Sequence, residues 1–174
     1  MIPPSLLRFV LVLCMASAAL LSTGTLHAQQ TGDWIVSLGA GGTLYSISTR
    51  FDDGTVVRGG VGYVLTPALM IEGGLRRHAC FDCDRFMIVD AGLQARHRGD
   101  RFSPFVSAGV GLSSDPEFMG SGWGAQAAVG SWVRLGGKWD LQLELRGRQV
   151  GFSSSNHMGE LSVGVAHRFT GTEP

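Results

Sequence analysis

Apolar residues alternate with small or polar residues along most of the chain after position 30. A period of two is typical of β-strands, because successive side chains point to opposite faces. Alternate positions of the first such stretch carry Trp34, Val36, Leu38 and Ala40. The pattern recurs along the chain, and no segment after position 30 keeps helical spacing for long. It predicts eight strands and an all-β fold.

The segments that separate these stretches alternate in length. Three are tight turns, at Thr66-Pro67, Arg98–Asp100 and Gly136–Lys138. Four are longer and polar, near residues 46–55, 77–85, 113–122 and 147–159. Short turns on one rim and long loops on the other are typical of an up-and-down meander. The sequence therefore predicts an eight-stranded antiparallel up-and-down β-barrel.

The two faces of the predicted strands differ in character. One face is aliphatic, whereas the other carries mostly Gly, Ser and Ala with isolated charges. Small residues and paired charges suit a crowded interior, and an aliphatic face suits lipid. A sheet in hydrocarbon must close, since an open edge leaves backbone groups unpaired. The pattern favours a transmembrane barrel, and a soluble lipocalin-like barrel is the alternative.

Aromatic residues near the strand ends support this interpretation, because aromatic girdles mark the two membrane interfaces. We expect Phe86 and Trp123 at the end with the long loops. The residues expected at the end with the short turns are Trp34, Tyr63, Phe102, Trp139 and Phe169.

The first 28 residues have the layout of a secretory signal peptide. Arg8 precedes an apolar run over residues 9–21, and a more polar segment leads to a cleavage site after Ala28. The apolar run is too short to span a membrane as a helix. We therefore expect a signal peptide at 1–28 and one barrel domain at 29–174.

Charge and composition limit the classes of molecule that the protein is expected to bind. The 14 basic and 14 acidic residues balance, which argues against a nucleic-acid partner. Lys138 is the only lysine, whereas soluble surfaces normally carry many. Nothing in the composition calls for a cofactor.

Several charged residues fall on the small-residue face and would point into the barrel. A barrel of eight strands has room inside only for side chains or one small ligand, and an unpaired buried charge is costly. We therefore expect a paired network, with a polar conduit as the alternative. The network residues are Arg58, Glu72, Arg76, Asp90, Arg96, Arg134, Glu144, Arg146, Glu160 and Arg168.

Two clusters suggest more specific chemistry. Cys80 and Cys83 are the cysteines left after signal removal, and an exported protein permits a disulfide between them. An inert pair, or a soft-metal site with His78, Asp82 and Asp84, is the alternative. Residue types of a hydrolase also gather near the end of the chain, and a serine-rich polar loop is the simpler explanation for them. They are Ser153, Ser154, Ser155, His157 and Glu160.

Three segments resemble the eight-stranded outer membrane protein β-barrel family, akin to the OmpA membrane domain and OmpX. They are Gly62–Pro67, Arg101–Phe105 and the final strand, whose outward residues are Leu161, Val163, Val165, His167 and Phe169. The final strand resembles the signal read by the barrel-assembly machinery. The family usually ends on the aromatic residue, whereas residues 170–174 follow it here.

The resemblance implies a location in the outer membrane of a Gram-negative envelope, with membrane lipid and the assembly machinery as partners. It implies little about activity, since one barrel type has many functions. We expect a non-enzymatic protein whose surface loops serve envelope integrity or surface interaction. A lipid-modifying enzyme is the alternative. Outer-membrane lipid A deacylases have a His-x-Ser-Asn order, whereas this chain has Ser155-Asn156-His157.

Overall fold

The computed structural model describes residues 31–46, 54–79, 86–97, 99–114, 122–150 and 156–170. These residues form strands of 11 to 14 residues, long enough to cross a bilayer at a tilt. The strands are β1 (Trp34–Ser46), β2 (Thr55–Thr66), β3 (Leu69–Ala79), β4 (Phe86–Arg96), β5 (Phe102–Ser113), β6 (Trp123–Gly136), β7 (Trp139–Val150) and β8 (Asn156–Phe169).

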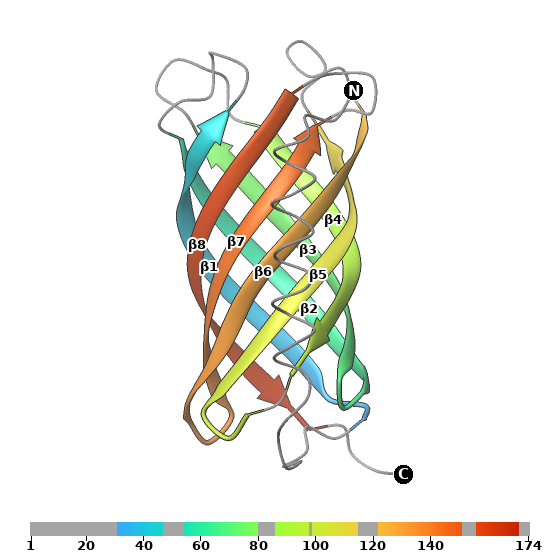
Figure 1. Ribbon diagram of the computed structural model, residues 1–174, viewed down its shortest axis with the longest axis vertical. Coiled ribbons are helices and arrows are strands. Elements are labelled where there is room, and N and C mark those ends of the chain that lie inside the picture. The colour runs from blue at the N-terminus through green and yellow to red at the C-terminus, as the bar shows by residue number, and fades with distance from the viewer. Residues whose placement is uncertain are drawn as a thin grey trace.

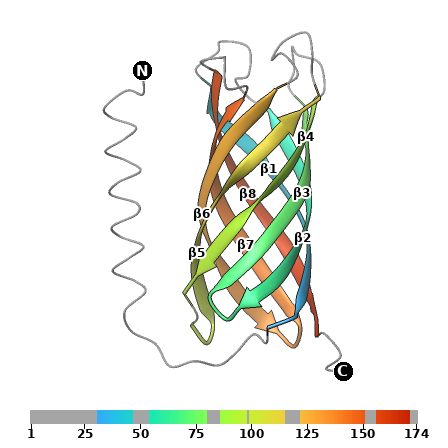
Figure 2. The same cartoon turned by 90° about the vertical axis from the view of Figure 1, so that its right-hand side faces the viewer.

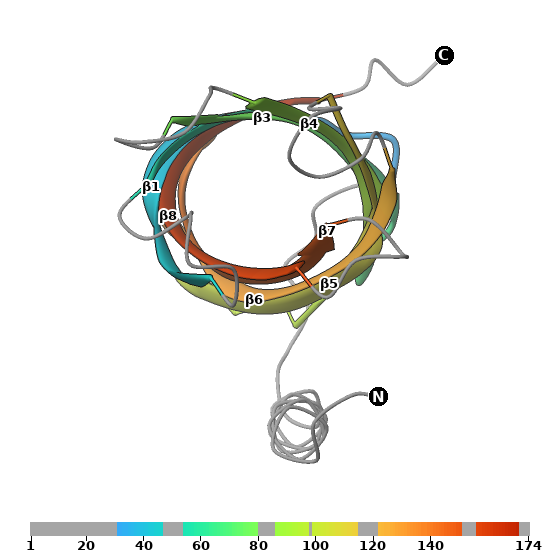
Figure 3. The same ribbon diagram turned by 90° about the horizontal axis from the view of Figure 1, so that it is seen from above.

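The strands form one closed antiparallel barrel in chain order. β1 pairs with β2 on one side and with β8 on the other, where Trp34 lies opposite Phe169. The strands tilt against the long axis (Figure 1), and from above they form a ring (Figure 3). The predicted fold is confirmed. No helix long and apolar enough to cross a membrane occurs among the described residues.

The two ends of the barrel differ. Short connections join β2 to β3, β4 to β5 and β6 to β7 at one end, which we call the turn end (Figure 2). Gly136 and Gly137 have positive φ angles of 136° and 56°, so the β6–β7 turn needs residues without a side chain. We call the opposite end the loop end; most of the residues in its four connections lie outside the described part of the chain.

Two of the predicted loops are too long. β3 continues to Ala79, β7 continues to Val150 and β8 begins at Asn156. Strand therefore replaces 77–79 of one predicted loop and 147–150 and 156–159 of the other. These strand ends carry arginine and histidine, which resemble loop composition. In the structure they keep the alternation, and His78 and Arg148 are buried inside the barrel.

The barrel is inside out compared with a soluble protein. Large apolar side chains point outward from every strand and are exposed, for example Leu38 at 63% and Val89 at 59%. Buried polar and charged residues outnumber the apolar ones in the interior. A continuous apolar exterior of this kind is stable only against lipid. The predicted orientation of the two faces is confirmed.

The interior also contains apolar layers near each end, which we did not expect. The layer near the turn end, the turn-side layer, consists of Ile35, Val64, Met70, Phe105, Trp132 and Ala166. Toward the loop end a second set of buried apolar residues forms the loop-side layer: Val56, Phe86, Ile88 and Met158. The charged residues in the middle of the barrel therefore lie between two apolar layers, and further charged residues lie near the turn end.

The turn-side layer fits tightly around Gly130. A Cβ atom built on Gly130 would lie 2.5 Å from Cζ of Phe105 and against the backbone of β7. Gly130→Ala is therefore expected to lower the free energy of unfolding by about 1–3 kcal/mol through overpacking. Gly147→Ala is the control, because a Cβ at Gly147 meets nothing within 4 Å. Urea unfolding in lipid vesicles measures both, and equal effects would contradict the tight packing.

The aromatic residues follow the predicted girdles with one exception. Trp34, Phe102, Trp139 and Phe169 are exposed near the turn end, and Trp123 is 56% exposed near the loop end. The placement of Phe86 in the outer girdle is wrong. Its ring is buried inside the barrel and stacks on His78, with ring centroids 4.6 Å apart. The two residues are register partners on β4 and β3, both at inward positions.

Candidate functional site

The middle of the interior holds a cluster of four arginines and four carboxylates, which we call the central cluster. Its side chains come from β2, β3, β4, β7 and β8, and all occupy inward positions because of the strand alternation. Positive and negative charges balance within it. The members are Arg58, Glu72, Arg76, Asp90, Glu144, Arg146, Arg148 and Glu160.

Arg76 links its own strand to three other strands of the cluster. Its Nε donates to Asp90 at 2.8 Å, its Nη2 to Glu144 at 2.9 Å and its Nη1 to Glu160 at 3.2 Å. Asp90 lies on the neighbouring strand, whereas Glu144 and Glu160 lie on β7 and β8. The guanidinium therefore links β3 to the opposite wall of the barrel.

Glu144 is the acceptor at the centre of the cluster. Its carboxylate accepts from Arg76 and Arg146, both at 2.9 Å, and from Arg58 at 3.4 Å. The amide of Gln142 also donates to it at 3.2 Å. Its side chain is only 1% exposed, so these donors replace water as its solvation.

Arg148 is the member of the cluster that the sequence interpretation missed. Its Nε lies 3.2 Å from Glu160 and its Nη2 lies 3.4 Å from Asp90. Residue 148 falls in the loop that the sequence predicts near residues 147–159. The signal that identifies it is the alternation Gln142, Glu144, Arg146, Arg148, which continues two residues beyond the predicted strand.

The other three predicted network residues lie near the turn end, outside the central cluster. Arg168 pairs with Asp140 at 2.7 Å, a partner that we had not expected. Arg96 is buried, and Arg134 is half-buried at an inward position near the end of β6. The structure therefore brings seven of the ten predicted residues together.

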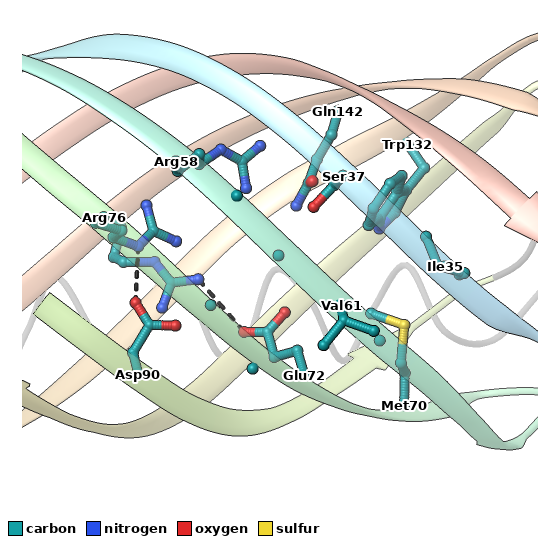
Figure 4. A pocket seen from close by; sticks show the side chains of 16 residues that line it. Ile35, Ser37, Arg58, Val61, Met70, Glu72, Arg76, Asp90, Trp132 and Gln142 are labelled. Carbon is teal, nitrogen blue, oxygen red and sulfur yellow. Dashed lines mark hydrogen bonds and ion pairs between the residues drawn. The ribbon is translucent and has the colours of Figure 1, made fainter.

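A small polar cavity adjoins the central cluster on the side of β2 and β3. Figure 4 shows Arg58, Ser37 and Gln142 on one side of it and Glu72 across from them. The cavity has about 30 Å³ open to water centres, enough for about two waters. Nε and Nη2 of Arg58 and Oε1 of Gln142 have no protein partner. These atoms suit water molecules, and the space is too small for a wide conduit.

The cysteine and metal proposals fall mostly on undescribed residues. Cys80, Asp82, Cys83 and Asp84 lie outside the described part of the chain. His78 lies on β3, and its side chain points into the barrel with Nε2 3.5 Å from Glu160. In the described ranges, no three His, Cys, Asp or Glu side chains form a group that could hold a metal ion.

The residues of the hydrolase cluster do not all converge. Ser153, Ser154 and Ser155 lie outside the described residues. Glu160 is buried inside the barrel between Arg76 and Arg148. His157, three positions earlier on β8, falls on the outer face, because odd positions of this strand point outward. A Ser–His–acid site would therefore need an acid other than Glu160.

The final strand presents its apolar residues to the outside. Leu161, Val163, Val165 and Phe169 are between 43% and 51% exposed. His167 lies between two aromatic rings, with its centroid 4.6 Å from Trp139 and 4.5 Å from Phe169. The strand thus contributes an aromatic row to the girdle at the turn end, next to the seam between β8 and β1.

Solved structures with the same fold have different functions. Neisserial surface protein A is 19% identical with a TM-score of 0.66, covering 79% of this chain and 97% of that chain. Ail of Yersinia pestis, in complex with the heparin analogue sucrose octasulfate, is 13% identical with a TM-score of 0.57, covering 80% and 100%. The outer membrane enzyme PagL is 15% identical with a TM-score of 0.56, covering 76% and 98%. Identities this low show the fold alone.

Comparison by sequence identifies the family. No curated protein matches the chain. The model of the outer membrane protein β-barrel domain matches residues 13–169, which include every strand of the barrel. This chain therefore belongs to the outer membrane protein β-barrel domain family.

Proposed function

We propose that this protein is a non-enzymatic outer-membrane barrel that acts through the long connections at its loop end. The observation that carries the proposal is the filled interior. A neutral central cluster between two apolar layers gives the barrel wall an internal core. Such an interior leaves no room for a partner inside the barrel, and the connections at the loop end are free to engage one on the cell surface.

The long connections are rich in acidic residues. Their carboxylates outnumber their basic side chains, Arg50 and Arg85, by six to two, the acidic residues being Asp52, Asp53, Asp82, Asp84, Asp115 and Glu117. An acidic surface attracts cationic partners and repels anionic ones. We therefore infer that the surface partner is cationic, in contrast to the sulfated ligand of Ail.

The test compares the full chain with a barrel that lacks its long connections. Residues 47–53, 80–85, 115–121 and 151–155 are replaced by short Gly-containing turns, and folding is checked by heat-modifiable migration. We expect intact cells with the full chain to bind polylysine-coated beads more than heparin-coated beads. Cells with the trimmed barrel should lose this preference. No difference between the two strains would contradict a role in surface interaction.

The same strains separate surface interaction from envelope integrity. If the barrel itself stabilises the envelope, the trimmed barrel should restore detergent resistance to a deletion strain as well as the full chain does. If the connections provide the function, only the full chain should restore the lost property. The enzymatic alternative predicts release of fatty acid from lipid by the purified protein, with loss of this release when Ser153, Ser154 and Ser155 are all changed to alanine.

Assembly gives a further prediction about the final strand. Phe169→Ala removes an exposed interfacial ring, so we expect less protein in the outer membrane and a smaller effect on the stability of refolded barrel. Deletion of residues 170–174 should leave the inserted amount unchanged. Both are measured by quantifying barrel in isolated outer membranes. Loss of insertion after the deletion, with no effect of Phe169→Ala, would show that the assembly signal does not lie on the final strand as proposed.

A further inference from the structure

The barrel separates its charges along its axis. The central cluster is neutral and the long connections are acidic, whereas the turn end is basic. Among the described residues near the turn end, basic side chains outnumber acidic ones by five to three. The basic residues are Arg96, Arg101, Arg134, Lys138 and Arg168, and the acidic residues are Asp33, Asp100 and Asp140. In outer-membrane barrels the short turns face the periplasm. The basic end of this protein therefore faces the periplasm.

Two arginines lie side by side at this end. The backbone N–H of Arg134 donates to the carbonyl of Arg101 at 2.9 Å, which places the start of β5 next to the end of β6. Arg101 is exposed and Arg134 is half-buried at an inward position, so both border the mouth of the barrel.

The carboxylate opposite Arg134 on the neighbouring strand is already engaged. Asp140 is the register partner of Arg134, but its carboxylate accepts from Arg168 at 2.7 Å. Lys138 donates to the hydroxyl of Thr170 at 3.0 Å. Within the described residues, no ion pair joins Arg101 or Arg134 to a carboxylate.

Two like charges on neighbouring strands repel each other, and a bound anion removes the repulsion. A guanidinium group presents a planar fork of donors that matches the oxygens of phosphate or carboxylate. We propose that Arg101 and Arg134 form an oxyanion-binding site at the periplasmic mouth of the barrel. This site is separate from the long connections and does not depend on what they bind.

The first test uses inorganic phosphate as the probe. The refolded protein in a sugar-based detergent micelle is titrated with phosphate at constant ionic strength, and the backbone amides of residues 101–103 and 132–134 are followed by NMR. We expect saturable shifts confined to these amides. Arg134→Gln should weaken binding about tenfold or more, since it removes a charged hydrogen-bond donor. Linear, non-saturating shifts would overturn the proposal.

Three variants sharpen the result. Arg101→Gln should weaken binding like Arg134→Gln. Arg77→Gln is the matched control, because Arg77 is an exposed arginine near the opposite end of the barrel, and binding should be unchanged. Asp140→Asn should tighten binding, because it removes the competing carboxylate and frees Arg168. Equal weakening in all the arginine variants would indicate a general charge effect and contradict a site.

The source of the oxyanion is distinguished in a bilayer. The protein is placed in nanodiscs of phosphatidylcholine with or without phosphatidylglycerol, and the same amides are followed. If lipid headgroups occupy the site, phosphatidylglycerol reproduces the shifts and soluble phosphate no longer adds to them. If a soluble periplasmic anion occupies it, phosphate produces the shifts in both lipids. No shift at these amides in either case would overturn the proposal.

Discussion

Glu144→Gln is expected to lower the free energy of unfolding by about 3–5 kcal/mol. The substitution keeps the size of the side chain but removes the charge that Arg58, Arg76 and Arg146 share. The central cluster is then left with four arginines and three carboxylates. The three guanidinium groups that contacted Glu144 lose a charged acceptor in a place that little water reaches. Urea unfolding of the protein in lipid vesicles measures the loss.

Asp140→Asn is the control on the same strand. It removes the same charge, but the pair with Arg168 lies near the end of the barrel, where the Arg168 side chain is 14% exposed. Water can replace part of the lost contact, so we expect a loss of about 1–2 kcal/mol. A loss for Glu144→Gln no larger than that for Asp140→Asn would show that the central cluster is not a cooperative core.

Leu143→Arg is expected to destabilise the barrel by about 2–4 kcal/mol, because Leu143 points outward near the middle of β7. Charge at this depth would have to be solvated by hydrocarbon. Leu135→Arg, at an exposed position near the turn end of β6, should change stability by no more than about 1 kcal/mol.

A second comparison separates lipid contact from crowding. Gln142 is the inward neighbour of Leu143 and is 2% exposed. Gln142→Arg would crowd the interior and add a fifth arginine to the neutral cluster. Its effect should therefore not depend on bilayer thickness, whereas that of Leu143→Arg should. Equal tolerance of arginine at positions 135, 142 and 143 would contradict the assignment of the two faces.

The architecture was predictable because one rule determines most of it. Alternation identifies the strands and their faces, and closure follows from the backbone hydrogen bonds that a membrane requires. The errors occurred where local composition competed with this rule. Arg148 was assigned to a loop because glycine and glutamine flank it there, at positions 147 and 149. Phe86 was assigned to a girdle because it is aromatic and terminal, although Met87 and Val89 on the same strand already place it inside.

The pairing inside the barrel could not be read from the sequence. Alternation gives the face of each residue, but the tilt of the strands decides which residues meet across the interior. Arg76 reaches Glu144 and Glu160, which follow it by 68 and 84 positions. The turn-side layer was missed for a related reason. Phe105 and Trp132 are inward by alternation, but large apolar residues were expected to face lipid.

Ion conductance across a planar lipid bilayer tests the central claim most directly, namely that the interior is a filled core and the protein acts through its long connections. The purified protein is refolded, checked for heat-modifiable migration and inserted into the bilayer. The filled, charge-paired interior predicts no current above that of the bare bilayer. Stable, discrete current steps from folded protein would contradict this account and favour a conduit through the barrel.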